Sequence, residues 1–201
     1  MPTTMVRKGQ LTFEEFVDIV QDGQKADLID GVLYLASPDS LENNDLNVWL
    51  SVVLRLFVGK KNGGKVYTSR VAYRIGPNRG PEPDLSFVPK ELLPRRRGGY
   101  FDGPPALAIE IVSPDSVFRD YVQKRQIYED AGVQEYWIID PEEKRATFLC
   151  LRNGRFKKMT PVRHVWHSKV LPGPNFDVRW FWDENRPEPD EVVQQLLRDS
   201  Q

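Results

Sequence analysis

Apolar residues form an almost continuous run near the middle of the chain, from Ala106 to Val112. Pro105 precedes this run and Ser113-Pro114 follows it, so its length and β-branched content predict a strand buried on both faces of a sheet. Glu110 lies within the run and is charged. Burying an unpaired carboxylate costs on the order of several kcal/mol. We therefore expect Glu110 to be paired with a cation, protonated or bound to a metal.

The segment after this run has the spacing of an amphipathic helix, which we expect over 118–131 with Gly132 at its end. At intervals of four and three residues, one face of that helix carries Val117, Tyr121, Lys124, Tyr128 and Ala131. Lys124 is the charged residue in this otherwise apolar and aromatic set. The spacing therefore predicts that Lys124 points inward, toward the strand that carries Glu110.

Hydrophobic spacing and turn residues also predict the remaining elements. Further helices are expected from the capping box Thr12-Phe13-Glu14-Glu15 to about Asp22, over 40–60 and over 190–198. Further strands are expected over 65–69, 71–75, 85–88, 135–140 and 146–151, with a hairpin over 28–33 that turns at Asp30-Gly31. The stretch 89–105 is polar and rich in Arg, Gly and Pro, so we expect a loop there.

The order of strand, helix and strand over 106–140 predicts a right-handed crossover between parallel neighbours. The predicted fold class is therefore α/β (α+β), with a mixed, curved sheet and helices packed against it. A length of 201 residues fits a single domain over 1–201, and 40% hydrophobic residues are enough for a core of its own.

Charge and cysteine content narrow the classes of function. The net charge is −1, so any nucleic-acid binding depends on local basic patches such as Arg95-Arg96-Arg97. Cys150 is the single cysteine, which excludes a disulfide within the chain and a cysteine-based zinc site. No signal peptide or apolar run of membrane-spanning length is found, so we expect a cytoplasmic protein without a membrane partner.

A second carboxylate suggests what Glu110 does. Asp84 follows Pro83 and opens the strand predicted over 85–88, so the two carboxylates lie on separate strands. Two carboxylates from neighbouring strands can hold one Mg²⁺, with water completing the octahedral shell. A lysine beside that metal, here Lys124, can orient or deprotonate a water and can balance charge that develops on a phosphate.

These residues carry a resemblance to a known family. Pro83-Asp84, Glu110-Ile111-Val112 and Lys124 resemble the PD-(D/E)XK nuclease superfamily, and within it the bacterial Uma-two group of restriction-endonuclease-like proteins. Further similar segments are Asp27-Leu28-Ile29-Asp30-Gly31, 109–116 and 132–141. The resemblance covers a core from about 12 to about 182, beyond which a C-terminal helix is expected at 190–198. It implies a restriction-endonuclease-like fold and hydrolysis of DNA phosphodiester bonds with Mg²⁺ or Mn²⁺.

The resemblance also implies a role for each matching residue. Asp84 and Glu110 correspond to metal ligands, and the Ile111 carbonyl to a third. The superfamily's usual lysine stands two residues after the second acid, where this chain has Val112, so Lys124 resembles its migrated replacement. Asp27 stands where the group usually has a glutamate, in a position that assists the metal site.

Several alternatives remain open on the sequence alone. In the first alternative, Glu110 and Lys124 form an ion pair that only holds the strand to the helix. Asp27 and the near-neutral charge favour a non-catalytic nucleic-acid- or protein-binding module with the nuclease fold. An enzyme acting on a small phosphorylated substrate is a weaker third hypothesis. DNA is the expected partner of the first hypothesis, with homodimerisation left open.

Other polar and aromatic residues are assigned structural roles. Glu135 begins a predicted strand, and we expect it to be solvated. Tyr128 and Trp137 are expected to pack in the core rather than to stack on bases. His164 and His167 are three residues apart, which on a strand places them on opposite faces, so a zinc site there is disfavoured.

Overall fold

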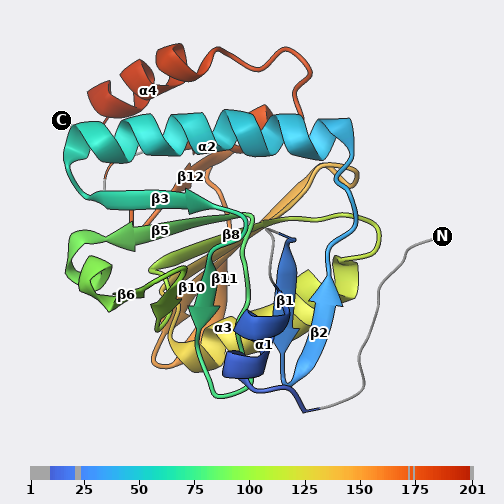
Figure 1. Ribbon diagram of the computed structural model, residues 1–201. Helices are drawn as coiled ribbons and strands as arrows, with labels where there is room; N and C mark the ends of the chain where they lie inside the picture. The colour runs from blue at the N-terminus through green and yellow to red at the C-terminus, as the bar shows by residue number, and fades with distance from the viewer. Residues whose placement is uncertain (1–9, 21–23, 172, 174, 200–201) are drawn as a thin grey trace.

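The centre of the computed structural model is a six-stranded mixed sheet (Figure 1). The structure describes residues 10–20, 24–171, 173 and 175–199, so the predicted helix end at Asp22 and the two ends of the predicted 1–201 domain lie outside the described residues. From edge to edge the strands are β11 (Arg155–Met159), β10 (Arg145–Arg152), β9 (Glu135–Asp140), β8 (Leu107–Ile111), β5 (Leu85–Pro89) and β3 (Gly64–Thr68). β8 and β9 are parallel, and the other described neighbours are antiparallel. The predicted mixed sheet and its parallel pair are confirmed.

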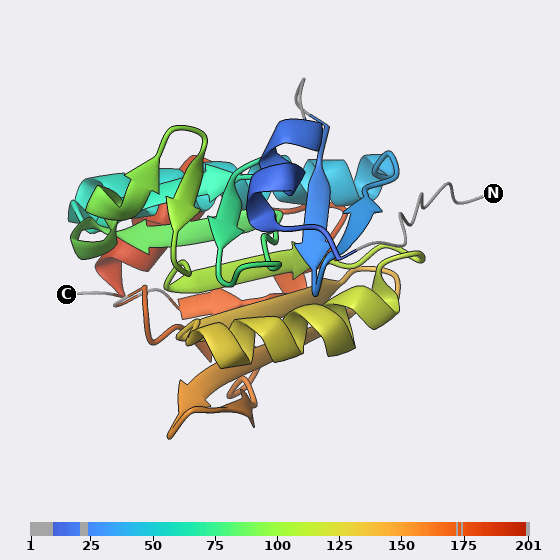
Figure 2. The ribbon, with the colours of Figure 1, turned by 60° about the horizontal axis from the view of Figure 1, so that its bottom comes forward.

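Helices cover both faces of this sheet (Figures 1 and 2). On one side, the α2 face, lies α2 (Leu41–Lys61), and α4 (Pro189–Arg198) packs beside it. On the other side, the α3 face, η2 (Arg119–Lys124) continues into α3 (Arg125–Ala131). The helices predicted over 40–60 and 190–198 are confirmed.

Strand β8 divides its side chains between these two faces because successive residues of a strand point in opposite directions. Leu107 and Ile109 belong to the core under α2. Ala108 and Val112 belong to the smaller core under α3. Glu110 shares the alternation of Ala108 and Val112, so it points toward α3.

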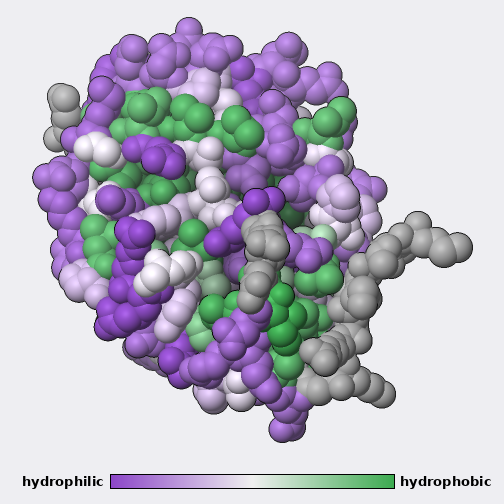
Figure 3. All heavy atoms as spheres, viewed as in Figure 1, coloured by the Kyte–Doolittle hydropathy of each residue, from purple (hydrophilic) through white to green (hydrophobic). Residues whose placement is uncertain are grey.

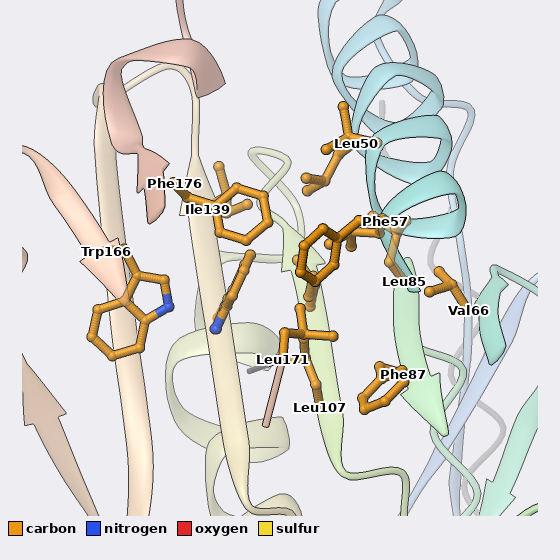
Figure 4. Packing of buried hydrophobic residues seen from close by; sticks show 14 of the residues in the cluster. Leu50, Phe57, Val66, Leu85, Phe87, Leu107, Ile139, Trp166, Leu171 and Phe176 are labelled. Carbon is orange, nitrogen blue, oxygen red and sulfur yellow. The ribbon is translucent and has the colours of Figure 1, made fainter. Parts of the chain in front are cut away.

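The core under α2 is large and aromatic (Figure 4). Trp137 of β9 lies edge-on to Phe148 and Phe176, with ring centroids 5.4 and 5.3 Å apart. Phe148 in turn stacks on Trp166, at 4.2 Å. Each such side chain contributes about 1.5–3 kcal/mol by leaving water. This packing holds β8 and β9 in place, and with them the polar groups on the opposite face.

Smaller sheets surround the central one. β1 (Ala26–Ile29) and β2 (Val32–Leu35) form the predicted hairpin, and its turn residues Asp30 and Gly31 have φ values of +49° and +80°. Positive φ at both turn positions is what a two-residue hairpin needs. The remaining small sheets contain β4 (Ala72–Arg74), β7 (Tyr100–Asp102) and β6 (Arg96–Arg97), and β12 (Val165–His167) with β13 (Asn175–Asp177).

The prediction of a loop over 89–105 was wrong for much of that segment. It contains the 3₁₀ helix η1 (Lys90–Arg95) and the strands β6 and β7. β7 pairs in parallel with β4, and Phe101 is buried with its ring stacked on Tyr73 at 5.5 Å. One buried aromatic residue therefore orders a stretch whose composition is otherwise that of a loop.

The first helix and the chain's later turns complete the fold. α1 (Phe13–Ile19) begins with the predicted capping box, in which the Glu15 N–H donates to Thr12 Oγ1 and the Thr12 N–H to the Glu15 carboxylate. The short 3₁₀ helix η3 (Val178–Phe181) follows β13. Among the described residues, no helix is both long and apolar enough to cross a lipid bilayer.

The helix predicted over 118–131 is present, but its first part, η2, is a π-helix. A π turn holds more residues than an α turn, so the inward face does not follow 3.6-residue spacing. Val117 was predicted to face inward and is instead 44% exposed, whereas Asp120 and Lys124 are each 2% exposed. The prediction for Val117 was wrong, and the inward position of Lys124 is confirmed.

Candidate functional site

Four side chains predicted from the sequence to form a site meet on the α3 face. Lys124 Nζ lies 2.9 Å from Oδ2 of Asp27 and 2.9 Å from Oε1 of Glu110. Leu85 of β5 is opposite Ile109 of β8, so the next step along this register brings Asp84 beside Glu110. All four side chains are buried. β1, the start of β5, β8 and η2 thus contribute one residue each.

Both oxygens of Asp84 have partners. Oδ2 accepts a hydrogen bond from the backbone N–H of Ile111 at 2.7 Å, which fixes the carboxylate against the end of β8. Oδ1 forms an ion pair with Lys25, which precedes β1. Ile111, whose carbonyl was predicted as a metal ligand, lines the same cavity as the four side chains. Lys25 was not predicted, because a lysine in a polar segment has no distinguishing sequence pattern.

The helix supplies two groups that the sequence did not identify. Asp120 accepts a hydrogen bond from Ser116 Oγ at 2.5 Å, and its Oδ1 is buried without a hydrogen-bond partner, 3.8 Å from Lys124 Nζ. The Tyr128 hydroxyl donates to Glu110 Oε1 at 2.8 Å. Tyr128 does pack in the core, as predicted, with its ring 4.9 Å from that of Tyr136. Its hydroxyl additionally holds the carboxylate of Glu110.

Arg119 is a further cation at the site. Its Nε lies 3.6 Å from Oδ2 of Asp27 and is buried without a hydrogen-bond partner. The guanidinium lies over the ring of Tyr34, 5.7 Å from the centroid. The contact with Tyr34 and the nearby carboxylate of Asp27 orient Arg119 toward the cavity. Its guanidinium retains N–H groups that can donate further hydrogen bonds.

The charged groups enclose a cavity of about 20 Å³, which has room for about one water-sized group. Its carboxylates are Asp27, Asp39, Asp84, Glu110, Asp115 and Asp120, and its cations are Lys25, Arg119 and Lys124. Carboxylates therefore outnumber cations in the lining. The negative charges repel one another in a poorly solvated space, and this repulsion is relieved either by protonation of some of the carboxylates or by an additional cation.

The surrounding carboxylates keep Lys124 charged. Burial by itself lowers the pKa of Lys124, but Asp27, Glu110 and Asp120 outweigh burial and raise it above its ordinary value. Burial likewise tends to raise the pKa of Asp27, but Lys124, Lys25 and Arg119 lower it overall. In this arrangement Lys124 therefore favours its protonated form, and Asp27 favours its ionised form beside it. A protonated Lys124 can donate hydrogen bonds but cannot accept a proton.

Glu110, Asp120 and Glu82 are shifted in the opposite direction. Burial raises the pKa of Glu110, and Lys124 offsets only part of this effect. Burial also raises the pKa of Asp120. Glu82, whose carboxylate accepts a hydrogen bond from the Ala26 N–H at 3.2 Å, is raised by burial to a pKa of about 7. Glu110, Asp120 and Glu82 therefore hold protons at pH values where exposed carboxylates have released them.

Replacing Glu82 by glutamine is expected to flatten the dependence of stability on pH. The pKa of Glu82 is about 7 in the folded chain against an ordinary value of 4.5, so between these values the folded chain retains a proton that the unfolded chain has released. The free energy of unfolding therefore falls as pH rises through this window, and Glu82 contributes roughly 2 to 3 kcal/mol of the fall. Urea unfolding between pH 4.5 and 8 measures it.

Glu143→Gln, at an exposed position, is the control and should leave the slope unchanged. If Glu82→Gln also leaves the slope unchanged, Glu82 is ionised in the folded chain throughout this range.

The prediction that Glu135 is solvated was wrong. Its side chain is fully buried on the α2 face. It accepts hydrogen bonds from Trp137 Nε1, Trp166 Nε1, Ser168 Oγ and the Lys169 N–H, at 2.6 to 3.2 Å. Trp166 belongs to β12, and Ser168 and Lys169 belong to the segment that follows it. Glu135 therefore holds β12 and this segment to the central sheet rather than forming part of the site.

Other candidate residues lie apart from the cavity. His164 and His167 are exposed, and the described residues contain no group of three or more His, Cys, Asp or Glu side chains arranged to hold a metal ion. Cys150 is buried in β10, as expected for a structural thiol. Arg95-Arg96-Arg97 spans η1 and β6, toward the opposite edge of the molecule from β2 (Figure 1), and does not line the acidic cavity.

A model of the Uma2 family, described as "Putative restriction endonuclease", matches residues 13–179. The chain belongs to the Uma2 family. The match spans the elements that supply Asp27, Asp84, Glu110 and Lys124. A comparison with curated proteins finds no match.

A solved structure confirms the fold of this Uma2 protein. It is a crystal structure described as a "putative nuclease belonging to DUF820" from Anabaena variabilis ATCC 29413. The TM-score is 0.65 at 18% sequence identity, over 92% of this chain and 99% of that chain. The predicted restriction-endonuclease-like α/β fold is therefore confirmed for the Uma2 chain.

Proposed function

We propose that this Uma2 protein is a metal-dependent endonuclease that hydrolyses phosphodiester bonds in DNA. The family and the structural neighbour support a nuclease in general. The observation that carries the finer proposal is the grouping of Asp84, Glu110 and a charged Lys124 in one acidic cavity. Carboxylates on neighbouring strands with a cation beside them are suited to phosphoryl chemistry.

The donor set fits Mg²⁺ or Mn²⁺. Asp84 and Glu110 supply hard oxygen ligands, and the excess of carboxylates in the cavity favours a further positive charge. Mg²⁺ is commonly held by only one or two carboxylates and keeps several waters. The described residues contain no group of three or more His, Cys, Asp or Glu side chains arranged around one metal position, which is compatible with a Mg²⁺ site that has two carboxylate ligands and several waters. Asp84, Glu110 and the Ile111 carbonyl are the proposed ligands.

A bound divalent ion would polarise the phosphate and lower the pKa of a coordinated water. The protein's own groups would position the substrate. Lys124, held protonated by its neighbours, donates hydrogen bonds to a phosphate oxygen or to the attacking water. Arg119 has a buried Nε free to donate in the same cavity. Asp27 keeps Lys124 charged and oriented. Tyr128 orients the carboxylate of Glu110 by donating a hydrogen bond to it.

The proposal predicts that purified protein nicks or linearises supercoiled plasmid in the presence of Mg²⁺ or Mn²⁺ and not in EDTA. Asp84→Asn should lower the rate by about 10²-fold or more, because it removes a ligand charge. Gel analysis of plasmid forms over time measures the rate. The matched control is Asp102→Asn, at an exposed position on β7, which should cleave like the wild type. Cleavage that persists in EDTA, or in Asp84→Asn at the wild-type rate, contradicts the assignment.

A non-catalytic DNA-binding module is the second candidate. The ion pairs of Asp84 with Lys25 and of Glu110 with Lys124 favour it, because internal cations already neutralise both proposed ligands. This candidate requires DNA binding that weakens with salt and no cleavage in any divalent metal. The plasmid assay, run together with a binding assay, separates the two.

A further inference from the structure

A second cavity, larger than the acidic one, lies beside it between α1, β4 and β7. Its volume is about 560 Å³, which is in the range of small-ligand sites. The residues that matter to its chemistry are Phe16, Val17, Arg70, Glu82, Arg97 and Tyr100. None of them belongs to the group assembled around Lys124.

The wall of this cavity is aromatic and aliphatic. Phe16 and Val17 of α1 both line the cavity; Phe16 is 2% exposed, so little of its ring is available to a ligand, while Val17 is 40% exposed. Tyr100 is held edge-on against Phe13, with centroids 4.9 Å apart. Figure 3 looks onto this side of the molecule and shows hydrophobic surface between hydrophilic side chains. A flat aromatic ligand would find rigid, apolar contacts here.

Two arginines line the same cavity. Arg70 and Arg97 are exposed, and within the described part of the chain neither forms an ion pair. Arg97 donates only to the backbone carbonyls of Pro94 and Arg96. Arg70 has φ of +73°, a conformation that costs a non-glycine residue about 1–2 kcal/mol. Exposed guanidinium groups beside an apolar wall complement a ligand that has both a ring and a phosphate.

One short segment joins the two cavities. Glu82 lines the larger cavity, and its backbone N–H donates to Asp27 Oδ1 at 2.8 Å. Asp27 contacts Lys124 in the acidic cavity, and Asp84, two residues after Glu82, lines that cavity too. A chain of nucleotides with one member in the larger cavity would therefore pass close to the proposed cleavage site.

We propose that the larger cavity binds one unstacked nucleotide of a DNA single strand, with its base against Val17 and Tyr100 and its phosphate near Arg70 and Arg97. The inference rests on the proposed endonuclease function and extends it. The substrate would be DNA with an unpaired nucleotide next to the bond that is cut, such as a single strand or a flap. Stacking on aromatic side chains together with arginine contacts is a general mode of single-strand binding.

The first test fills the cavity. Val17→Trp should weaken binding of a fluorescent single-stranded oligonucleotide by about tenfold, since the stacking of one base is lost. Ile19→Trp is the matched control, because Ile19 is 43% exposed on the same helix and does not line the cavity. Fluorescence polarisation in EDTA measures affinity without cleavage. Binding of a blunt duplex of the same sequence should be equal in both variants.

The second test removes one cation. Arg97→Ala should reduce the slope of log K against log salt by about 0.7, the value for one phosphate contact on a single strand. Arg96→Ala, at the exposed neighbouring position that does not line the cavity, removes the same charge and should leave the slope unchanged. Equal effects of the two substitutions would mean that only general charge attraction is involved and would overturn the assignment.

Other outcomes are equally decisive. If Val17→Trp and Ile19→Trp bind the single strand equally well, the cavity does not hold a nucleotide. If a fluorescent deoxynucleoside monophosphate binds the wild type but not Val17→Trp, while the oligonucleotide binds both proteins equally, the ligand is a soluble nucleotide, and the DNA-strand assignment is overturned. Because binding is measured in EDTA, failure here is distinguishable from failure of the plasmid cleavage assay.

Discussion

Replacing Glu110 by glutamine is expected to reduce metal-dependent DNA cleavage by on the order of 10³-fold. Glutamine preserves the shape of the side chain and can still accept the hydrogen bond from Tyr128. It lacks the negative charge that the proposed metal site needs. Stability should change little, because the substitution removes a buried charge whose pKa burial already raises. The rate of plasmid nicking, normalised to folded protein, is the measurement.

Glu135→Gln is the matched control for this experiment. Glu135 is also fully buried and lies on the neighbouring strand, but it faces α2 and bonds to two tryptophans. Its substitution should cost stability, since an amide cannot accept all of its hydrogen bonds, and should leave cleavage per folded molecule unchanged. If Glu110→Gln cleaves as fast as wild type, Glu110 is not a metal ligand and its pair with Lys124 is structural.

Replacing Lys124 by methionine is expected to destabilise the protein by about 3–5 kcal/mol. Methionine has a similar length but leaves Asp27 and Glu110 without their shared cation, and both are almost fully buried. An uncompensated buried carboxylate is among the largest single costs to folding. Urea unfolding at pH 7 measures the loss. The loss should shrink at pH 5, where the carboxylates take up protons instead.

Arg125→Met controls for the loss of a basic residue from the same helix. Arg125 is exposed and immediately follows Lys124, so the substitution should change stability by less than about 0.5 kcal/mol. A Lys124→Met protein as stable as wild type, at every pH, would mean that the carboxylates around it are not ionised. The acidic cavity would then lack the negative charge that a metal site needs.

Much of the fold could be predicted because its strands and helices have clear patterns. The apolar run around Glu110 is a buried strand, and the alternation of Leu107 and Ala108 between two cores explains why it is apolar throughout. The same pattern made Glu110 conspicuous, because a charge in such a run has no ordinary explanation. Lys124 followed from its place on an apolar helix face and Asp84 from its place at the start of a neighbouring strand, and the family resemblance then gave each residue a role.

The site's remaining members could not be predicted in this way. Lys25 lies in a polar segment, where a lysine is ordinarily solvated, and it is half-buried because β1 brings it beside Asp84. Glu135 was assigned to solvent because strand-start glutamates usually are, and the segment after β12 that buries it is distant in sequence. Contacts between segments far apart in sequence decide both cases, and periodicity contains no information about them.

The π-helical turn at Arg119–Lys124 has a consequence for how such proteins diverge. A π turn arises when a single residue is inserted into an α-helix, and it shifts every later side chain around the helix axis. Asp120 and Lys124 both face the cavity in this arrangement, whereas Val117, which α-helical spacing places on the same side as Lys124, is exposed. Gain or loss of one residue can thus change which side chains a helix presents to a sheet, while the sheet stays as it was. The number of residues that separates Glu110 from Lys124 is therefore not fixed by the geometry of the sheet.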